Sequence, residues 1–444
     1  MHKKFLSSIL IGTMCLSLVA CNNTTQTTQE TPIQSTVTTT EDVQSIEDDT
    51  ETISVVDTIT TEEDSSEDDE IVDIDELSGI DSATANLGLD LLYQQYSISN
   101  DAQNVVVSPI SIQNAMFLAL IGANGNTYDE LWANTYLGVY GNDIETIGKG
   151  LQNSNVQIAN SVFVREDGIS EDDEVFKEYI KDTDKYANAT SQRIPFDSTG
   201  VSIVNQWVSD NTNEKIKEIV QEFSPDDMAM LVNTAYFNSN WKEKFTEQKD
   251  FTFTNRDGST STIDAMSSKS KDIVGFVDDD FDMVAKEYKD GYSFVAIMPH
   301  NVDIKDYIKE CDRSIISDIA VHPEEYNNVY LTMPSFKLKY DCALIPAFEQ
   351  MGVHDAFGNA ADFSKMSSSA DLYISDIRHS VYVDVNTEGT EAAASTSVTM
   401  TNKSIEMDTC DTVILNKPFI YAIVNNTTGE IAFIGVIDNM DALQ

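Results

Sequence analysis

Residues 383–398 read Val383-Asp384-Val385-Asn386-Thr387-Glu388-Gly389-Thr390-Glu391-Ala392-Ala393-Ala394-Ser395-Thr396-Ser397-Val398, a stretch that begins as a β-strand. Val383 and Val385 alternate with polar neighbours, the period of two that is typical of a pleated segment. From Gly389 onward, glycine and alanines lower the strand propensity, although the alternation continues. We interpret the stretch either as a strand that joins a sheet only when more of it inserts, or as an edge strand running into a polar surface loop.

The alternation assigns the side chains after Gly389 to two faces. One face would carry Thr390, Ala392, Ala394, Thr396, Val398 and Met400. The other face would carry Glu391, Ala393, Ser395, Ser397, Thr399 and Thr401. If the stretch inserts into a sheet, we expect the first face to point toward the interior.

Several motifs resemble the serpin family, and they follow in the family's order from Ser82 to the end of the chain. Residues 386–394 resemble the hinge of the serpin reactive loop, and the hinge residues would be Glu388, Gly389, Thr390, Glu391, Ala392, Ala393 and Ala394. The other matching motifs are Ser108-Pro109-Ile110-Ser111, Asn233-Thr234-Ala235-Tyr236-Phe237-Asn238-Ser239-Asn240-Trp241-Lys242-Glu243-Lys244-Phe245 and Leu415-Asn416-Lys417-Pro418-Phe419-Ile420.

The resemblance implies a mixed α/β chain built as one unit with the serpin fold. That fold would have a large central, mostly antiparallel sheet, additional sheets, about nine helices and an exposed reactive loop. Periodicity in the sequence predicts strands over 156–164 and 228–238. Residues 329–339 resemble the family's proline-phenylalanine strand, which implies one strand there. Periodicity also predicts one helix over 198–220, with Ile203, Trp207 and Ile216 on an apolar stripe.

The N-terminal segment is typical of an exported protein. Lys3 and Lys4 precede an apolar run, residues 5–20, that is too short to span a membrane. The run ends in 18–21, Leu-Val-Ala-Cys, which resembles the bacterial lipoprotein signal, where cleavage precedes the cysteine and the cysteine receives lipid. The alternative is a plain secretory peptide with an incidental cysteine. We expect a signal peptide over 1–20, lipidation at Cys21, and a location at the cell envelope or surface, facing the extracellular space.

An acidic segment follows the signal. Residues 22–80 contain no Lys, Arg, Trp, Tyr or Phe, and such a composition cannot bury enough apolar area to order itself. We expect a disordered tether over 21–81 and the serpin domain over 82–444. The formal net charge of −48 argues against nucleic-acid binding and against electrostatic attraction to anionic lipid.

No motif predicts catalysis or a cofactor. The five His residues are scattered, and neither a nucleophile motif, a glycine-rich phosphate loop nor a zinc spacing is present. We therefore expect no enzymatic activity, no cofactor and no metal. His379 by itself is typical of a core histidine. The resemblance implies that it lies under the main sheet with Asn233, Ser108 and Ser111, in a cluster that controls sheet opening, and that Trp241 covers the top of the sheet.

The resemblance also implies a function and partners. A serpin of this kind would inhibit a serine protease as a monomer: the protease cleaves the reactive loop, forms an acyl-enzyme, and is trapped when the loop inserts into the sheet. The small residues Ala392 to Ala394 favour an inhibitor. The alternatives are an inhibitor of cysteine proteases, a cleavable substrate, and a non-inhibitory binding protein, adhesin or scaffold that shares the fold.

The reactive bond is expected at Lys403-Ser404, by counting from Gly389 at the family's spacing. A lysine before the bond suits a trypsin-like protease with an acidic specificity pocket. Met400 and Met407 are alternative positions. A separate departure concerns the hinge: Thr387 occupies a position that is usually acidic in the family, with Glu388 next to it, so a salt bridge expected there would be missing or shifted.

The first prediction concerns the lipid anchor. Cys21→Ser removes the thiol that would receive lipid, so the protein should move from the membrane fraction into the medium. Fractionation followed by immunoblotting measures this directly. A variant that stays with the membrane as the unchanged protein does would contradict lipidation at Cys21.

Overall fold

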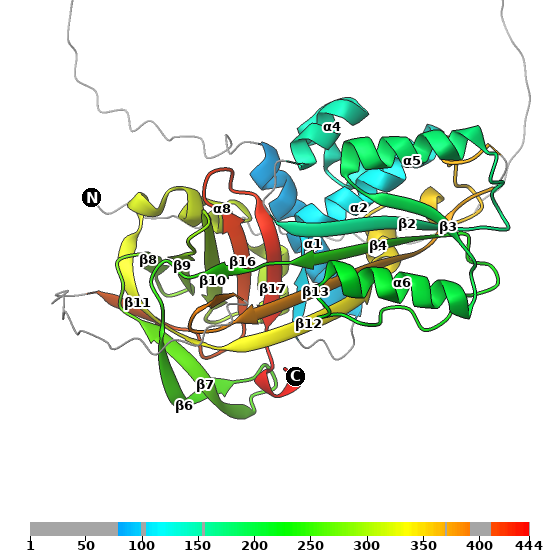
Figure 1. Cartoon of the computed structure of the whole chain (residues 1–444). Helices are drawn as coiled ribbons and strands as arrows, with labels where there is room; N and C mark the ends of the chain where they lie inside the picture. The colour runs from blue at the N-terminus through cyan, green and yellow to red at the C-terminus, as the bar shows by residue number, and fades with distance from the viewer. Residues whose placement is uncertain (1–78, 99–103, 153–155, 369–370, 391–409, 444) are drawn as a thin grey trace, which may run out of the picture. The chain divides into compact units, whose positions relative to one another are not determined.

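The computed structural model of the protein describes residues 79–98, 104–152, 156–368, 371–390 and 410–443 (Figure 1). The α-helices in these ranges are α1 Gly79–Ile98, α2 Pro109–Gly122, α3 Gly125–Asn134, α4 Ile144–Leu151, α5 Glu174–Ala187, α6 Ser198–Asn211, α7 Ile304–Glu310, α8 Ser314–Val321 and α9 Ile345–Gln350. Short 3-10 helices are η1 Leu137–Tyr140, η2 Pro323–Glu325, η3 Asp355–Phe357 and η4 Met440–Ala442.

The strands form two sheets. Their bounds are β1 Val105–Val107, β2 Gln157–Arg165, β3 Thr190–Ile194, β4 Ala229–Tyr236, β5 Ser239–Asn240, β6 Thr246–Thr254, β7 Thr260–Ser268, β8 Ile273–Val277, β9 Phe281–Glu287, β10 Tyr292–Pro299, β11 Asn327–Pro334, β12 Phe336–Ala343, β13 Ile374–Val385, β14 Gly389–Thr390, β15 Asp411–Ile414, β16 Phe419–Asn425 and β17 Ile431–Ile437. One sheet has ten strands in the order β1-β17-β16-β10-β9-β8-β11-β7-β6, with β15 beside β11.

The second sheet has seven strands in the order β3-β2-β4-β13-β14-β5, with β12 on the other edge of β13. It is mostly antiparallel, but β2 and β3 at one edge are parallel, and so is the central pair, β4 and β13. The register of this pair runs without a shift from Asp376 opposite Met230 to Tyr382 opposite Tyr236. Parallel strands need a long crossover connection. The crossover from β4 to β13 contains most of the strands of the ten-stranded sheet.

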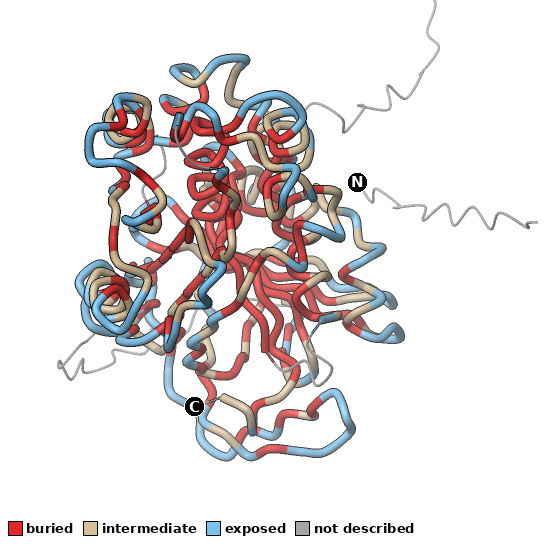
Figure 2. The backbone as a smooth tube through the Cα atoms, turned by 90° about the vertical axis from the view of Figure 1, so that its right-hand side faces the viewer, coloured by how far each residue is buried: buried red, intermediate tan, exposed pale blue. Residues whose placement is uncertain are grey.

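The core lies between the sheets and the helices packed on them. Helix α2 is buried along all fourteen of its residues, as expected of a helix that is apolar on every side. Pro109 is its first residue, where the missing N–H costs no helical hydrogen bond. Figure 2 shows buried residues concentrated along the strands and the inner helices, with exposed residues at the outer turns.

Helix α6 covers the opposite face of the seven-stranded sheet (Figure 1). Val204 and Val208 pack with Phe163 of β2 and Met230 of β4 in a second apolar cluster. Asp197 begins the helix by accepting hydrogen bonds from the backbone N–H groups of the first turn. Helix α6 therefore covers the β2–β4 part of this face of the sheet.

The prediction of one helix over 198–220 is wrong for residues 212–220. Helix α6 ends at Asn211, and Asn213 and Glu214 adopt left-handed backbone conformations, with φ of 48° and 61°, that a continuous helix does not allow. The Thr212 hydroxyl donates to Val208 O at 2.8 Å and so satisfies one of the last helical carbonyls. Ile216 is buried, but in the segment that follows the helix.

Two other boundaries differ from the expectation. The segment expected as one strand over 329–339 belongs to two strands in different sheets, since β11 ends at Pro334 and β12 begins at Phe336. The first helix begins at Gly79, inside the segment expected as tether, and the Asp81 side chain is buried against the fold. No helix in the described ranges is long and apolar enough to cross a membrane.

Candidate functional site

A buried polar cluster lies in the middle of the β4–β13 pair. His379 of β13 stands opposite Asn233 of β4, and the His379 Nδ1 atom is hydrogen-bonded to Asn233 Oδ1. Below them, the Ser108 backbone N–H donates to His379 Nε2 at 3.0 Å. The Asn233 side-chain amide donates to the Ser111 carbonyl at 2.8 Å, so the start of α2 is tied to both strands.

The hydrogen bonds determine the tautomer of His379. A backbone N–H can only donate, so Nε2 must be the unprotonated acceptor and Nδ1 must carry the proton given to Asn233. Burial lowers the pKa of His379 to about 3, because the charged imidazolium would lose its hydration. Protonation would also place a second N–H against the Ser108 N–H. The cluster is therefore complete only with a neutral histidine.

The hinge lies at the end of β13, apart from this cluster. Asn386 N–H donates to Gly389 O at 2.9 Å, which closes a tight turn after Val385. Gly389 and Thr390 then form β14, antiparallel to β13 on one side and to β5 on the other. Strand β5 follows β4 in the chain after two residues. The first hinge residues therefore lie between β13 and the continuation of β4.

Gly389 is needed for this close approach. A Cβ atom at this position would lie 2.1 Å from Ser239 O and 2.6 Å from Asn240 Cα, which are backbone atoms that cannot move aside. Thr390 is fully buried, and its hydroxyl is 2.6 Å from the hydroxyl of Tyr288. The hinge is thus held by backbone pairing and by one buried side-chain hydrogen bond.

Trp241 donates two hydrogen bonds to the turn that precedes Gly389. Its indole N–H donates to Asn386 O at 2.7 Å and its backbone N–H to Glu388 O at 3.0 Å. The indole ring stacks on Tyr288 with ring centroids 4.1 Å apart. Tyr288 in turn holds Thr390. Trp241 therefore contacts the hinge directly, at a different level of the sheet from His379.

A buried lysine lies beneath these aromatic rings. The Lys286 side chain is completely buried, with its ammonium 5.9 Å from the centre of the Trp241 ring and 5.0 Å from that of Phe245. Its ion-pair partner is Asp272, at 3.0 Å. Burial lowers the pKa of Lys286, although Asp272 opposes that shift.

The hinge carries an ion pair one residue after Thr387. Glu388 pairs with Lys244, and the Phe245 N–H donates to Thr387 O at 3.1 Å. The hinge therefore has a salt bridge at Glu388, one residue after Thr387. Since both side chains are partly exposed, this bond contributes less than the buried contacts of Trp241.

The structure also adds residues that the sequence did not single out. Asn160 of β2 accepts a hydrogen bond from Asn233 at 2.5 Å, and an asparagine inside an apolar strand is a signal that could have pointed to it. Tyr288 and Lys244 carried no comparable signal. The expected residues Glu391, Ala392, Ala393, Ala394, Lys403, Ser404 and Cys21 lie outside the described ranges. Among the described residues, no group of three or more His, Cys, Asp or Glu side chains is placed to hold a metal ion.

The second prediction concerns pH. The unfolded chain binds a proton at His379 below about pH 6.5, and the native state only near pH 3, so the free energy of unfolding should fall by up to about 1.4 kcal/mol per pH unit on acidification between these values. His379→Gln keeps a side chain that can both donate and accept but does not titrate. We expect it to be less stable at neutral pH and to lose this part of the slope in urea denaturation between pH 7 and 4.5. Equal slopes in both proteins would contradict the assignment.

Comparison with known proteins gives one consistent result. The family described as Serpin (serine protease inhibitor) matches residues 82–440. An uncharacterized serpin-like protein of Methanosarcina acetivorans is 29% identical over 385 residues, which cover 82% of this chain and 88% of the relative. The leukocyte elastase inhibitor of Homo sapiens is 29% identical over 386 residues, which cover 80% of this chain and 98% of that protein.

Solved structures agree with the sequence comparison. The thermophilic serpin Tengpin in its native state has a TM-score of 0.71 and 28% identity, covering 81% of this chain and 94% of its own. Human thyroxine-binding globulin has a TM-score of 0.70 at 19% identity, covering 82% of this chain and 99% of its own, a likeness of fold alone. The serpin fold expected from the sequence is confirmed, and because the family match spans most of the chain, the protein belongs to the serpin family.

Proposed function

We propose that this serpin inhibits a serine protease by insertion of its cleaved reactive loop between β4 and β13. Serpins are typically protease inhibitors, although some, such as thyroxine-binding globulin, are non-inhibitory. One observation carries the proposal: Gly389 and Thr390 pair antiparallel with both β13 and β5. The loop therefore starts at the end of the β4–β13 pair between which it would insert.

The two registers at the hinge are compatible with insertion. Thr390 stands opposite Val385 on one side and opposite Ser239 on the other. If both ladders continue residue by residue, Ala394 would pair with Val381 and Ala235, which already face each other in the β4–β13 ladder. Thr396 would likewise meet His379 and Asn233. An inserted strand would thus find both partners in register, without a bulge.

The energetics favour insertion once the loop is cut. Insertion exchanges one parallel ladder for two antiparallel ladders, and about a dozen added hydrogen bonds at ~1 kcal/mol each approach the stability of an ordinary domain. Small side chains are needed on the inward face, because Val381, Val383 and Ala235 are buried there. Ala392 and Ala394 meet this requirement, whereas a bulky or charged hinge would favour the alternative of a non-inhibitory serpin.

The finer assignments follow from the sequence. The proposed reactive bond is Lys403-Ser404, which a trypsin-like protease would cleave to form the acyl-enzyme. Insertion would then carry the bound protease away before deacylation. We further propose that Cys21 carries lipid, and that the protein acts as a monomer tethered at the cell envelope or surface.

The third prediction tests the inhibitory function. Incubation with trypsin-like, chymotrypsin-like, elastase-like and papain-like proteases should yield a complex that survives heat and detergent, visible on denaturing gels, with the trypsin-like enzymes. Mass spectrometry of the released C-terminal peptide should find Ser404 at its new N-terminus. Lys403→Glu should abolish that complex, because an acidic pocket repels the glutamate. If every protease cleaves the loop without forming a complex, the protein is instead a cleavable substrate or a binding protein.

The fourth prediction tests insertion. Ala392→Arg would drive a charge toward the buried face as the loop inserts, at an effective cost of several kcal/mol, and each 1.36 kcal/mol felt in the insertion barrier slows insertion about tenfold. Thr390→Arg would place its charge at a position that is already buried beside Tyr288 before cleavage, and so would also displace the start of the hinge. Both variants should be cleaved at the same bond and released without stable complex. Ala393→Arg is the matched control, since its register partners Tyr382 and Tyr236 lie on the other face, and it should keep more of the complex.

The ratio of complex to cleaved product distinguishes the outcomes. If the inward and outward arginines reduce complex equally, the assignment of faces is wrong. If all three variants still form complex in full, inhibition does not use loop insertion.

A further inference from the structure

Lys286 of β9 and Asp272, the residue before β8, form a buried ion pair. The Lys286 side chain is 0% exposed and that of Asp272 is 6% exposed, with Lys286 Nζ 3.0 Å from Asp272 Oδ2. The two residues lie on neighbouring strands, because Ile273 at the start of β8 stands opposite Lys286 in an antiparallel ladder. A backbone that holds two reactive groups in contact raises their effective concentration far above that of a bimolecular encounter.

The surroundings of the pair do not satisfy two charges. An ammonium has three donors, and the described residues offer Lys286 Nζ one oxygen acceptor, Asp272 Oδ2, beside the rings of Trp241 and Phe245. Asp272 Oδ1 is buried and has no hydrogen-bond partner among those same residues. Buried charges with incomplete hydrogen bonding cost free energy, which favours the neutral forms of both groups.

One proton transfer along the existing hydrogen bond makes both groups reactive. Moving a proton from Lys286 Nζ to the Asp272 carboxylate gives a neutral amine next to a neutral carboxylic acid. Burial lowers the pKa of Lys286, although Asp272 opposes that shift. A lysine amine that is desolvated in this way is an activated nucleophile. The amine and the carboxyl carbon that it can attack are therefore already side by side.

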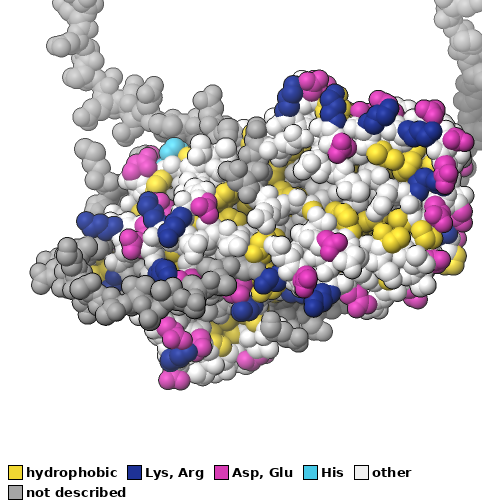
Figure 3. All heavy atoms as spheres, in the orientation of Figure 1, with side chains coloured by type: hydrophobic (Ala, Val, Ile, Leu, Met, Phe, Trp, Pro, Cys, Tyr) yellow, Lys and Arg dark blue, Asp and Glu magenta, His cyan; other side chains and the backbone are white. Residues whose placement is uncertain are grey.

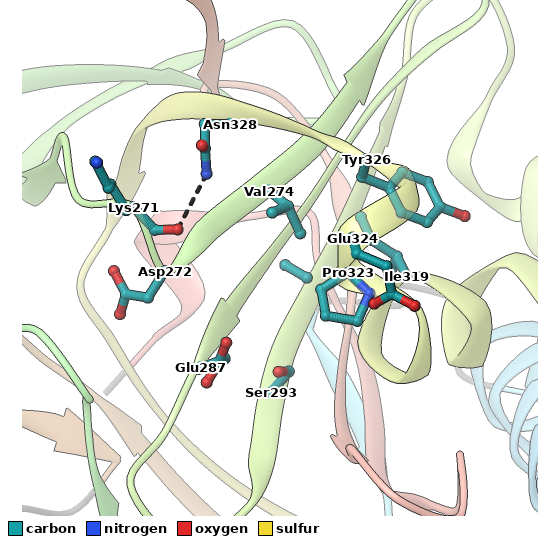
Figure 4. A pocket seen from close by; sticks show the side chains of 11 residues that line it. Lys271, Asp272, Val274, Glu287, Ser293, Ile319, Pro323, Glu324, Tyr326 and Asn328 are labelled. Carbon is teal, nitrogen blue, oxygen red and sulfur yellow. Dashed lines mark hydrogen bonds between the residues drawn. The ribbon is translucent and has the colours of Figure 1, made fainter. Parts of the chain in front are cut away.

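We propose that Lys286 and Asp272 are joined by an intramolecular isopeptide bond. Nζ attacks Cγ of the protonated carboxyl group, and the bond between Cγ and the hydroxyl oxygen breaks. The hydroxyl leaves with one Nζ proton as water, so the condensation needs no oxidant, reductant or cofactor. Asp272 is one of the residues that line a pocket of about 360 Å³ on the ten-stranded sheet, which gives the water a path to solvent (Figure 4). Two buried charges thereby become one neutral amide.

The bond would link the entry of β8 to β9 beside the rings that contact the hinge. The backbone N–H of Lys242 donates to Glu287 O at 3.0 Å, so the segment that carries Trp241 is already joined to β9 next to Lys286. A covalent crosslink there restricts the unfolded chain and thus favours the folded one. The bond would form in the folded chain whether or not the protein inhibits a protease.

A second lysine–carboxylate pair provides an internal comparison. Lys242 pairs with Glu287 close by, but its side chain is 54% exposed and that of Glu287 is 30% exposed. Water solvates both of these charges, which keeps the amine protonated and the carboxylate ionised at neutral pH. We therefore expect an amide at Lys286 and none at Lys242.

Peptide mapping by mass spectrometry of the folded, purified full-length protein tests the proposal. After denaturation, trypsin should cut after Lys271 and Lys289 but not after Lys286, and residues 272–289 should be one water molecule lighter than their sequence. Breaking the backbone once between 272 and 286 should release no separate fragment, because the bond closes this segment into a ring. A protease that cuts after acidic residues should open the ring within 278–282 and leave its two parts joined.

Two variants locate the bond. Lys286→Arg keeps a positive charge beside Trp241, but a guanidinium stays protonated and does not attack the carboxyl group, so residues 272–289 should keep their full mass. Lys242→Arg is the matched control and should still lose the water. The proposal is overturned if the unchanged protein yields linear 272–286 at its full mass, if Lys286→Arg still loses the water, or if Lys242→Arg abolishes the loss. The peptide from the unchanged protein decides the question even if Lys286→Arg does not fold.

Discussion

The parallel pairing of β4 and β13 is the constraint on which the other features depend. Two parallel strands leave a position between them in which a third strand, running the opposite way, can pair antiparallel with both. At the end of this pair the chain begins a strand of that direction, since β13 turns back through Asn386 and continues as β14 between β13 and β5. The crossover between β4 and β13 holds most of the ten-stranded sheet, so the pair cannot rearrange into an antiparallel one.

The hinge and the central cluster act on this pair in different ways. The hinge holds a starting position: Gly389 allows backbone contact with β5, and Trp241 and Tyr288 fix the turn and the first inward side chain. The central cluster holds the pair together, since its hydrogen bonds join β4, β13 and the start of α2. Opening the sheet would require these buried polar groups to find new partners, which makes the closed state specific as well as stable.

Positive and negative side chains are mixed on the surface, although the net charge of the chain is strongly negative. The chain is strongly acidic as a whole, yet Figure 3 shows Lys and Arg interspersed with Asp and Glu on the face that carries α6. Near the hinge, three lysines each pair with a carboxylate: Lys242 with Glu287, Lys244 with Glu388 and Lys337 with Asp384. The buried pair of Lys286 and Asp272 lies beside the aromatic rings that contact the hinge. Local ion pairs, rather than the net charge, therefore set the electrostatic surroundings of the hinge.

The sequence by itself identified the family through its motifs, and it predicted the hinge and the inward-facing positions, because strand alternation and small side chains are local properties that are read directly from neighbouring residues. Periodicity also predicted β2 and β4, but it extended α6 past Asn211, since the left-handed residues Asn213 and Glu214 carry no strong breaker signal. Only the tertiary structure decided the shared register of β4, β13 and β14, the tautomer of His379 and its tie to α2. It alone also brought together Asn160 with Asn233 and Tyr288 with Thr390, because each contact joins residues that are far apart in the chain and depends on how the strands are ordered.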